Sequence, residues 1–208
     1  AEEQGSLRDI CYTAGVRRSH HAHRLCVVGS NREELRRGLK GYVAEESAAG
    51  VYSGRKNVGP RLKVAFVFAG QGTQWIGTGR ELLRSEAVFR RKLEECEAAM
   101  GPYLDWSVLA LLRSEELGEA ERLRLRETRV MQPLLFALQV GLAELWRSWG
   151  VEPDAVVGHS MGEVAAACVS GALSLAEGAR VICLRGEAMA GGHGHGGISF
   201  VVLGISGL

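Results

Sequence analysis

The sequence lacks the features that mark a membrane, secreted or nucleic-acid-binding protein. Its 208 residues carry 25 basic and 24 acidic side chains, a net charge of +1. This balance predicts no basic surface for nucleic acid or for an anionic membrane. The sequence also has no run of about 18 apolar residues and no charged-then-apolar leader, so we expect neither a membrane span nor a secretory signal. We therefore expect a cytosolic protein.

Cysteine is scarce and scattered, and no C-x-x-C spacing occurs. The five are Cys11, Cys26, Cys96, Cys168 and Cys183. An odd set without spacing predicts neither a disulfide framework nor a metal site, and reduced thiols in apolar surroundings act as small hydrophobes. His20, His21 and His23 have no cysteine or carboxylate pair to complete a metal site, so we interpret them as part of a solvated loop.

The apolar pattern predicts an α/β fold over most of the chain. Residues 63–68 and 154–158 predict buried parallel strands. Amphipathic patterns predict helices over about 78–85, 86–100, 106–113 and 117–127. Gln132-Pro133 opens an apolar helix that is expected to run to about Trp149. We therefore predict a hydrolase-like, mostly parallel sheet with helices on both faces.

Residues 1–60 differ from the rest of the sequence in their pattern of apolar and polar residues. This pattern predicts a small α+β linker domain before the main domain, 61–208. A helical pattern over 7–14, a strand over 25–28 and a helix capped by Ser30 or Asn31 precede a turn-rich, charged stretch over 50–60. The sequence begins without methionine and stops directly after an apolar run. We interpret it as a piece of a longer protein.

The sequence Gly158-His159-Ser160-Met161-Gly162 is the best candidate for a catalytic centre. It is a G-x-S-x-G pattern between a short apolar strand and an alanine-rich helix, which is typical of a nucleophile elbow. Glycine suits these places because the serine backbone is strained and neighbouring chains pass too close for a Cβ atom. The start of the following helix offers free N–H groups to an oxyanion. The alternative is a chance glycine-rich turn.

Two further features carry potential chemistry. Gly70-Gln71-Gly72 follows a buried strand, where its amides could bind an anion, although a tight turn would need the same residues. Neither G-x-G-x-x-G nor a P-loop is completed. Arg185 lies on an apolar face of a helix that Ser174 caps. Its guanidinium therefore requires an anion, an ion pair with Glu163, or a snorkelling path to water.

Together these motifs resemble the malonyl-CoA:acyl-carrier-protein acyltransferase domain of a modular or iterative type I polyketide synthase. The resemblance runs from about residue 62 to 203 and rests on four motifs in the family's order: FAGQGTQW at 68–75, QP at 132–133, GHSMGE at 158–163, and Arg185. Residues 7–60, with YTAGVRRSHH at 12–21, resemble the linker between ketosynthase and acyltransferase in such synthases. Nearly the whole chain is covered.

The resemblance implies a role for each motif. Ser160 would take the acyl group from coenzyme A, the backbone amides of Gln71 and Met161 would form the oxyanion hole, and Arg185 would hold the free carboxylate of malonyl or methylmalonyl. Gln132 and His159 would line the pocket. The acyl group would pass to the phosphopantetheine thiol of an acyl carrier protein, beside an adjacent ketosynthase and other synthase domains, and the domain itself would hold no cofactor.

The sequence departs from the family because the general-base histidine lies in a later segment, and His193 and His195 do not match it by position. We expect a fragment that is inactive alone, with the ferredoxin-like subdomain cut off after a strand over 198–203. Two alternatives stay open. An α/β-hydrolase such as a thioesterase shares the elbow but has no need for Arg185. A non-catalytic docking fragment would rely on residues 1–60.

Overall fold

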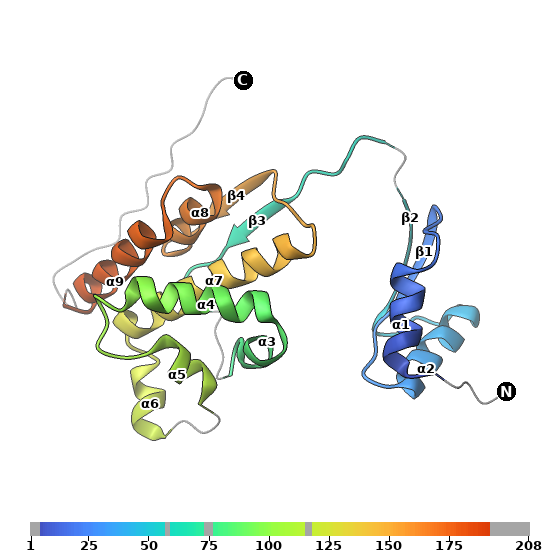
Figure 1. The fold of residues 1–208 in the computed structure, drawn as a ribbon, viewed down its shortest axis with the longest axis horizontal. Coiled ribbons are helices and arrows are strands. Elements are labelled where there is room, and N and C mark those ends of the chain that lie inside the picture. The colour runs from blue at the N-terminus through green and yellow to red at the C-terminus, as the bar shows by residue number, and fades with distance from the viewer. Residues whose placement is uncertain (1–4, 57–58, 73–76, 115–117, 192–208) are drawn as a thin grey trace. The chain divides into compact units, whose positions relative to one another are not determined.

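The computed structural model describes residues 5–56, 59–72, 77–114 and 118–191, and it divides the chain into two compact units, Ala1–Leu62 and Lys63–Leu208 (Figure 1). The loop and strand expected over 191–203 lie almost entirely outside the described residues. No helix in the described ranges is long and apolar enough to cross a membrane.

The first unit is a two-stranded antiparallel sheet with two helices. In chain order it contains α1 (Leu7–Val16), β1 (His23–Val27), α2 (Arg32–Val43) and β2 (Val51–Arg55). Asn31 caps α2 by accepting a hydrogen bond from the Glu34 amide. The expectation of an irregular stretch over 50–60 is wrong, because Val51 pairs with Val27 and opens β2. The glycines and charges nearby obscured a short strand in which only Val51 and Tyr52 are of the β-branched or aromatic type.

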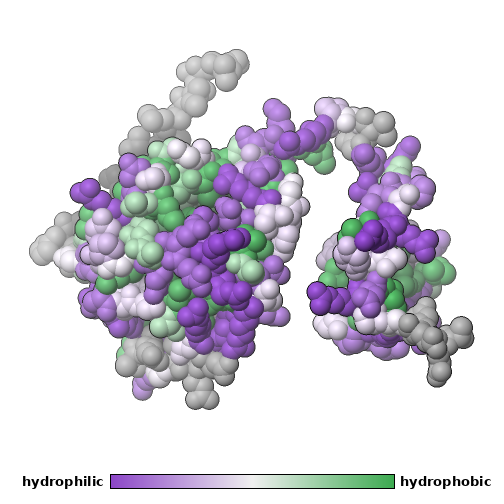
Figure 2. All heavy atoms as spheres, in the orientation of Figure 1, coloured by the Kyte–Doolittle hydropathy of each residue, from purple (hydrophilic) through white to green (hydrophobic). Residues whose placement is uncertain are grey.

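The first unit buries little of its apolar surface. Helix α1 has no buried residue, and the buried positions of α2 are the glycines Gly38 and Gly41. Tyr42, Val43 and Tyr52 are exposed, and Figure 2 shows apolar residues at the surface of this unit. A unit that buries so few side chains gains little hydrophobic free energy on folding.

The second unit is built around two parallel strands, β3 (Ala65–Phe68) and β4 (Ala155–Gly158), with Phe68 opposite Gly158. Seven helices of this unit are described: α3 (Arg80–Ser85), α4 (Ala87–Met100), α5 (Val108–Arg113), α6 (Glu119–Arg124), α7 (Thr128–Ser148), α8 (Gly162–Ser170) and α9 (Leu175–Gly191). The predicted α/β class and the parallel pairing are confirmed.

The core of the second unit lies between the long helices. Helix α7 packs against α4, α8 and α9, and α8 packs against both strands. Phe89, Leu93, Phe136 and Ile182 are fully buried there. Alternate strand residues differ sharply in exposure, since Phe68 is 5% exposed and Val67 is 73% exposed. This alternation follows from the opposite orientation of successive strand side chains, and the prediction that the strands are buried on both faces is not met, since Val157 of β4 is also 54% exposed.

Helix α7 begins earlier than its proline predicts. It starts at Thr128, so Pro133 lies inside the helix rather than at its first turn. The buried side chains of Val130 and Met131 explain the difference. Their burial extends the helix toward its N-terminus, although Pro133 has no N–H to donate to the carbonyl of Arg129.

Candidate active site

Ser160 lies in a strained turn between β4 and α8. Its φ angle is +56°, in the left-handed region that non-glycine residues rarely adopt. The turn requires glycine on both sides, since a Cβ atom on Gly158 would lie 2.3 Å from Cα of Glu163, and one on Gly162 would lie 2.2 Å from the carbonyl oxygen of Phe68. The predicted elbow geometry is therefore present, and it holds Ser160 exposed at the carboxyl end of the sheet.

Arg185 reaches the nucleophile from α9. Its Nη2 atom donates a hydrogen bond to Ser160 Oγ at 3.1 Å. Its Nη1 atom is buried and has no hydrogen-bond partner among the described residues. The predicted alternative of an ion pair with Glu163 is not found, because no carboxylate in the described ranges lies within ion-pair distance of Arg185. A buried N–H donor without an acceptor is costly, which favours an anionic ligand at this place.

The residues expected to form an oxyanion hole lie beside the elbow. Met161 is fully buried and forms the N-cap of α8, where backbone N–H groups have no acceptor within the helix. Gln71 follows the end of β3 by three residues, and the preceding Gly70 lies against His159, so that a Cβ atom on Gly70 would be 2.8 Å from Nδ1 of His159. This contact brings the Gly70-Gln71 segment next to the serine turn.

Gln132 is a buried polar side chain between α7 and α9. It is 1% exposed, and its Nε2 atom contacts Met189 Sδ at 3.3 Å. Its Oε1 atom is buried without a donor in the described part of the chain. Met189 lies one helical turn after Arg185 on α9. The amide of Gln132 therefore lies near the helix face that carries the arginine, with most of its hydrogen-bonding capacity unused.

Sequence reasoning missed Gln139. This residue lies on α7, and its Nε2 atom donates a hydrogen bond of 2.7 Å to the carbonyl oxygen of Ala69, the residue directly after β3. A signal was present, since Gln139 interrupts an otherwise apolar stretch of the helix between Leu138 and Val140. The same polar-in-apolar argument that drew attention to Arg185 applies to it.

Three cysteines of the second unit have raised pKa values. Burial raises the pKa of Cys96 and of Cys183 to about 12, so both thiols stay protonated at neutral pH. Burial also raises the pKa of Cys168. No group of His, Cys, Asp and Glu within the described ranges could hold a metal ion.

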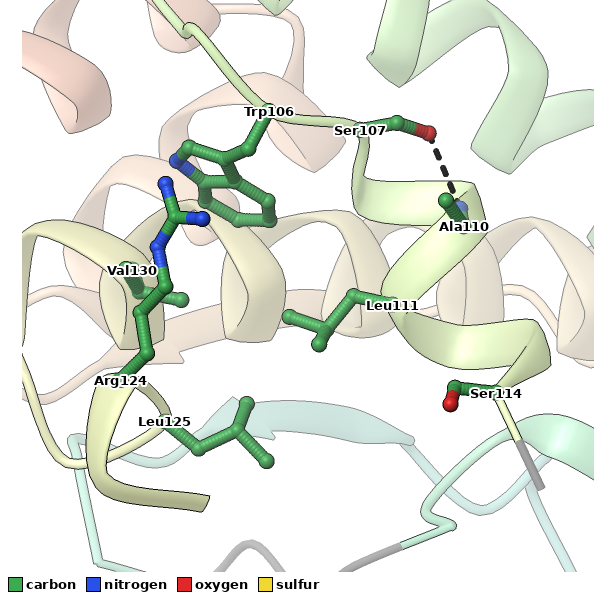
Figure 3. Close-up of a pocket in the computed structure, with 8 residues that line it drawn as sticks. All are labelled: Trp106, Ser107, Ala110, Leu111, Ser114, Arg124, Leu125 and Val130. Atoms are coloured by element: carbon green, nitrogen blue, oxygen red, sulfur yellow. Dashed lines mark hydrogen bonds between the residues drawn. The ribbon is translucent and has the colours of Figure 1, made fainter. Parts of the chain in front are cut away.

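A cavity of about 240 Å³ opens between α5 and the junction of α6 with α7 (Figure 3). Figure 3 shows the side chains of Trp106, Arg124 and Leu125 at its wall. Arg124 pairs with Asp105 at 3.4 Å. None of the predicted site residues lines this cavity. It is therefore separate from the serine turn.

Comparisons with known proteins agree with the geometry. The family model described as "Acyl transferase domain" matches residues 65–206, and a model described as "CurL-like, PKS C-terminal" matches residues 1–39. Polyketide synthase GfsA of Streptomyces halstedii is 46% identical over 200 residues, which are 96% of this chain and 3% of that protein. Erythronolide synthase EryA2 of Saccharopolyspora erythraea is 47% identical over 188 residues, 90% of this chain and 5% of that protein.

A solved structure gives the same result. The acyltransferase domain from module 8 of the salinomycin polyketide synthase is 40% identical and has a TM-score of 0.74. The match covers 90% of this chain and 44% of that domain. The chain therefore spans less than half of this solved relative and a small fraction of the curated synthases.

Proposed function

This chain belongs to the acyl transferase domain family, and on that premise we propose that Ser160 carries a malonyl-type group from coenzyme A to an acyl carrier protein. The observation that carries the proposal is the hydrogen bond of 3.1 Å from Arg185 to Ser160. It places a fixed cation beside a nucleophile that lies on an elbow.

In the first half-reaction, Ser160 Oγ attacks the thioester carbonyl and forms a new C–O bond. The oxyanion that develops accepts hydrogen bonds from the backbone amides of Gln71 and Met161. The C–S bond then breaks, the coenzyme A sulfur takes up the serine proton through a general base, and the acyl-serine remains. The dipole of α8 favours the negative charge near Met161.

Arg185 selects the substrate. In a malonyl or methylmalonyl group, one carbon separates the free carboxylate from the thioester carbonyl, so the cation must lie close to the nucleophile. The Nη1 and Nη2 atoms present two donors to that carboxylate, and each charge-assisted hydrogen bond contributes roughly 1.5–3 kcal/mol. In this proposal Gln132, whose side chain is buried, and His159 contact the rest of the acyl group.

In the second half-reaction, the phosphopantetheine thiol of an acyl carrier protein attacks the acyl-serine, and Ser160 leaves with the proton returned. No cofactor on this chain takes part. The general base would be the family's histidine, which His193 and His195 do not match by position. Residues 1–60 serve as the linker to an adjacent ketosynthase, which is supported by the match of residues 1–39 to a polyketide synthase family model.

The test joins this chain to the C-terminal region of a solved relative and measures transfer of the acyl group from malonyl-CoA and methylmalonyl-CoA to an acyl carrier protein. We expect transfer that Ser160→Ala abolishes. Hydrolysis of the acyl-CoA without transfer would indicate a thioesterase instead. Failure of the wild-type protein to form any acyl-serine would indicate a docking role.

A further inference from the structure

We propose that Gln139 is a positioning residue that fixes the oxyanion loop, defined here as residues 69–72, for the reaction at Ser160. The inference rests on the proposed function, because it assigns a role within the same site. Gln139 comes from the middle of α7, and the loop that it contacts leaves the end of β3.

The first observation is the place of the contact. The parallel ladder ends where the carbonyl of Phe68 accepts a hydrogen bond from the His159 amide at 2.9 Å. The next carbonyl, that of Ala69, accepts from Gln139 Nε2 at 2.7 Å. Gln139 therefore holds the first residue after the ladder, Ala69, which directly precedes Gly70 and Gln71.

The second observation is that Gln139 lies on a helix that is packed firmly in the core. Helix α7 is fixed in the core by Phe136, Leu138 and Ala143, which are all nearly inaccessible to solvent. The carbonyl of Ala69 is also within 2.9 Å of the place where a Cβ atom on Gly162 would lie. The loop is therefore held between the core helix and the start of α8, the element that supplies the Met161 amide.

The third observation is that half of the Gln139 amide is unused. Its Oε1 atom is buried and meets no donor among the described residues. An apolar side chain of similar size would avoid the cost of this buried acceptor. The glutamine is consequently explained by its Nε2 donor, whose one acceptor within the described part of the chain is the carbonyl of Ala69.

Loss of the Gln139 contact should lower kcat although Gln139 does not touch the substrate. An oxyanion donor contributes most when it is already aimed at the developing charge, and removal of one donor lowers kcat by about a hundredfold to a thousandfold. Release of the loop misplaces a donor rather than removing it. We therefore expect Gln139→Leu to lower kcat about tenfold to a hundredfold, with KM within about threefold of wild type.

Arg147 provides a matched control on the same helix. Its Nη2 atom donates to the carbonyl oxygen of Val169 at 2.8 Å, at the far end of α8 from the serine. Arg147→Met therefore removes the same kind of side-chain-to-carbonyl contact away from the oxyanion loop, together with the ion pair of Arg147 with Glu152. We expect it to lower the melting temperature while kcat changes less than about twofold.

Gln139→Glu tests the donor itself. An ionised carboxylate cannot donate to the Ala69 carbonyl, whereas a protonated one can. The kcat of this variant relative to wild type should therefore be low at about pH 8 and should recover as the pH falls toward about 5.5. Dividing by the wild-type value removes the shared titration of the general base.

The kinetic constants are measured in the chain joined to the C-terminal region of a solved relative, and amide hydrogen exchange is measured in the 208-residue chain itself. In Gln139→Leu the His159 amide, which donates to Phe68, should exchange about fivefold to tenfold faster. An unchanged exchange rate with unchanged kcat, or a loss of kcat no larger than that of Arg147→Met, would overturn the proposal. If the wild-type protein forms no acyl-serine, the proposed function fails, and the exchange rate still decides whether Gln139 restrains the loop.

Discussion

The guanidinium of Arg185 lies 3.1 Å from the hydroxyl oxygen of Ser160, across the gap between α9 and the turn that opens α8. Arg185 lies on α9 and Ser160 lies in the turn between β4 and α8, and the contact does not involve a carboxylate. This arrangement joins a cation to a nucleophile, and Arg185 Nη1 is buried with no acceptor among the residues that the structure describes. In the proposed function, the free carboxylate of the acyl group accepts hydrogen bonds from both Nη atoms of Arg185.

Substitution of Arg185 is expected to change substrate choice. Arg185→Ala should lower kcat/KM for malonyl-CoA by about a hundredfold or more, because it removes two charge-assisted hydrogen bonds. The value for acetyl-CoA should change little or rise, since a neutral acyl group leaves the arginine unpaired. Steady-state kinetics of the chain extended at its C-terminus would measure both constants.

Arg185→Lys should restore only part of the activity toward malonyl-CoA, because an ammonium group cannot present a planar fork. Equal losses for malonyl-CoA and acetyl-CoA, or a much lower melting temperature in Arg185→Ala, would show that the arginine is structural. The carboxylate would then have to bind elsewhere.

The elbow glycines should tolerate no side chain. Gly162→Ala is expected to lower the free energy of unfolding by about 2–5 kcal/mol, because its Cβ atom would overlap the Phe68 carbonyl. Gly101→Ala is the control, since its Cβ atom would make ordinary contacts at 3.5 Å and its φ angle is −48°. Chemical denaturation would compare the two, and similar losses would contradict the assigned close approach at Gly162.

The 208-residue chain alone should transfer acyl groups slowly. We expect a rate about 10²-fold to 10⁴-fold below that of the chain extended through the family's histidine, because general-base catalysis typically contributes that factor. Single-turnover assays with malonyl-CoA would measure it. Comparable rates in the two forms would mean that another group in this chain takes the serine proton.

The cysteines should divide into two classes by reactivity. Cys11 and Cys26 are exposed, whereas burial raises the pKa of Cys96 and Cys183 to about 12. At about pH 8 the buried thiols therefore hold roughly a thousandfold less thiolate than a free cysteine in water does, and their alkylation should be slower by a similar factor. Reactivity should increase in the buried pair only as the pH rises toward their raised pKa. Mass spectrometry after timed alkylation of the native chain would measure these rates, and fast alkylation of Cys96 or Cys183 at about pH 8 would contradict the prediction.

The local features of the site could be predicted from the sequence. The positive φ angle of Ser160 and the close approach at Gly158 follow from a glycine-flanked serine between a strand and a helix. Arg185 could be singled out as a charge on an apolar face, but its partner could not. The choice between Glu163 and Ser160 depends on how α8 and α9 pack, and sequence spacing along one helix does not contain that information.

The other differences between the sequence predictions and the structure also arise from contacts between elements. Strand β2 was missed because short strands in turn-rich sequence depend on a partner, here β1, for their hydrogen bonds. Helix α7 starts before Pro133 because burial of the preceding residues outweighs the lost hydrogen bond. Gln139 gains its role from a contact with Ala69, which is distant in sequence.

The most direct test of the proposed mechanism is to locate the acyl group on the protein. The chain joined to the C-terminal region of a solved relative, wild type or Ser160→Ala, is incubated with malonyl-CoA, quenched in acid and digested, and the peptides are sequenced by mass spectrometry. We predict one malonyl group, on Ser160, that is absent from the Ser160→Ala variant and leaves when an acyl carrier protein is added. A malonyl group on another residue, or equal labelling of the two proteins, would contradict the account.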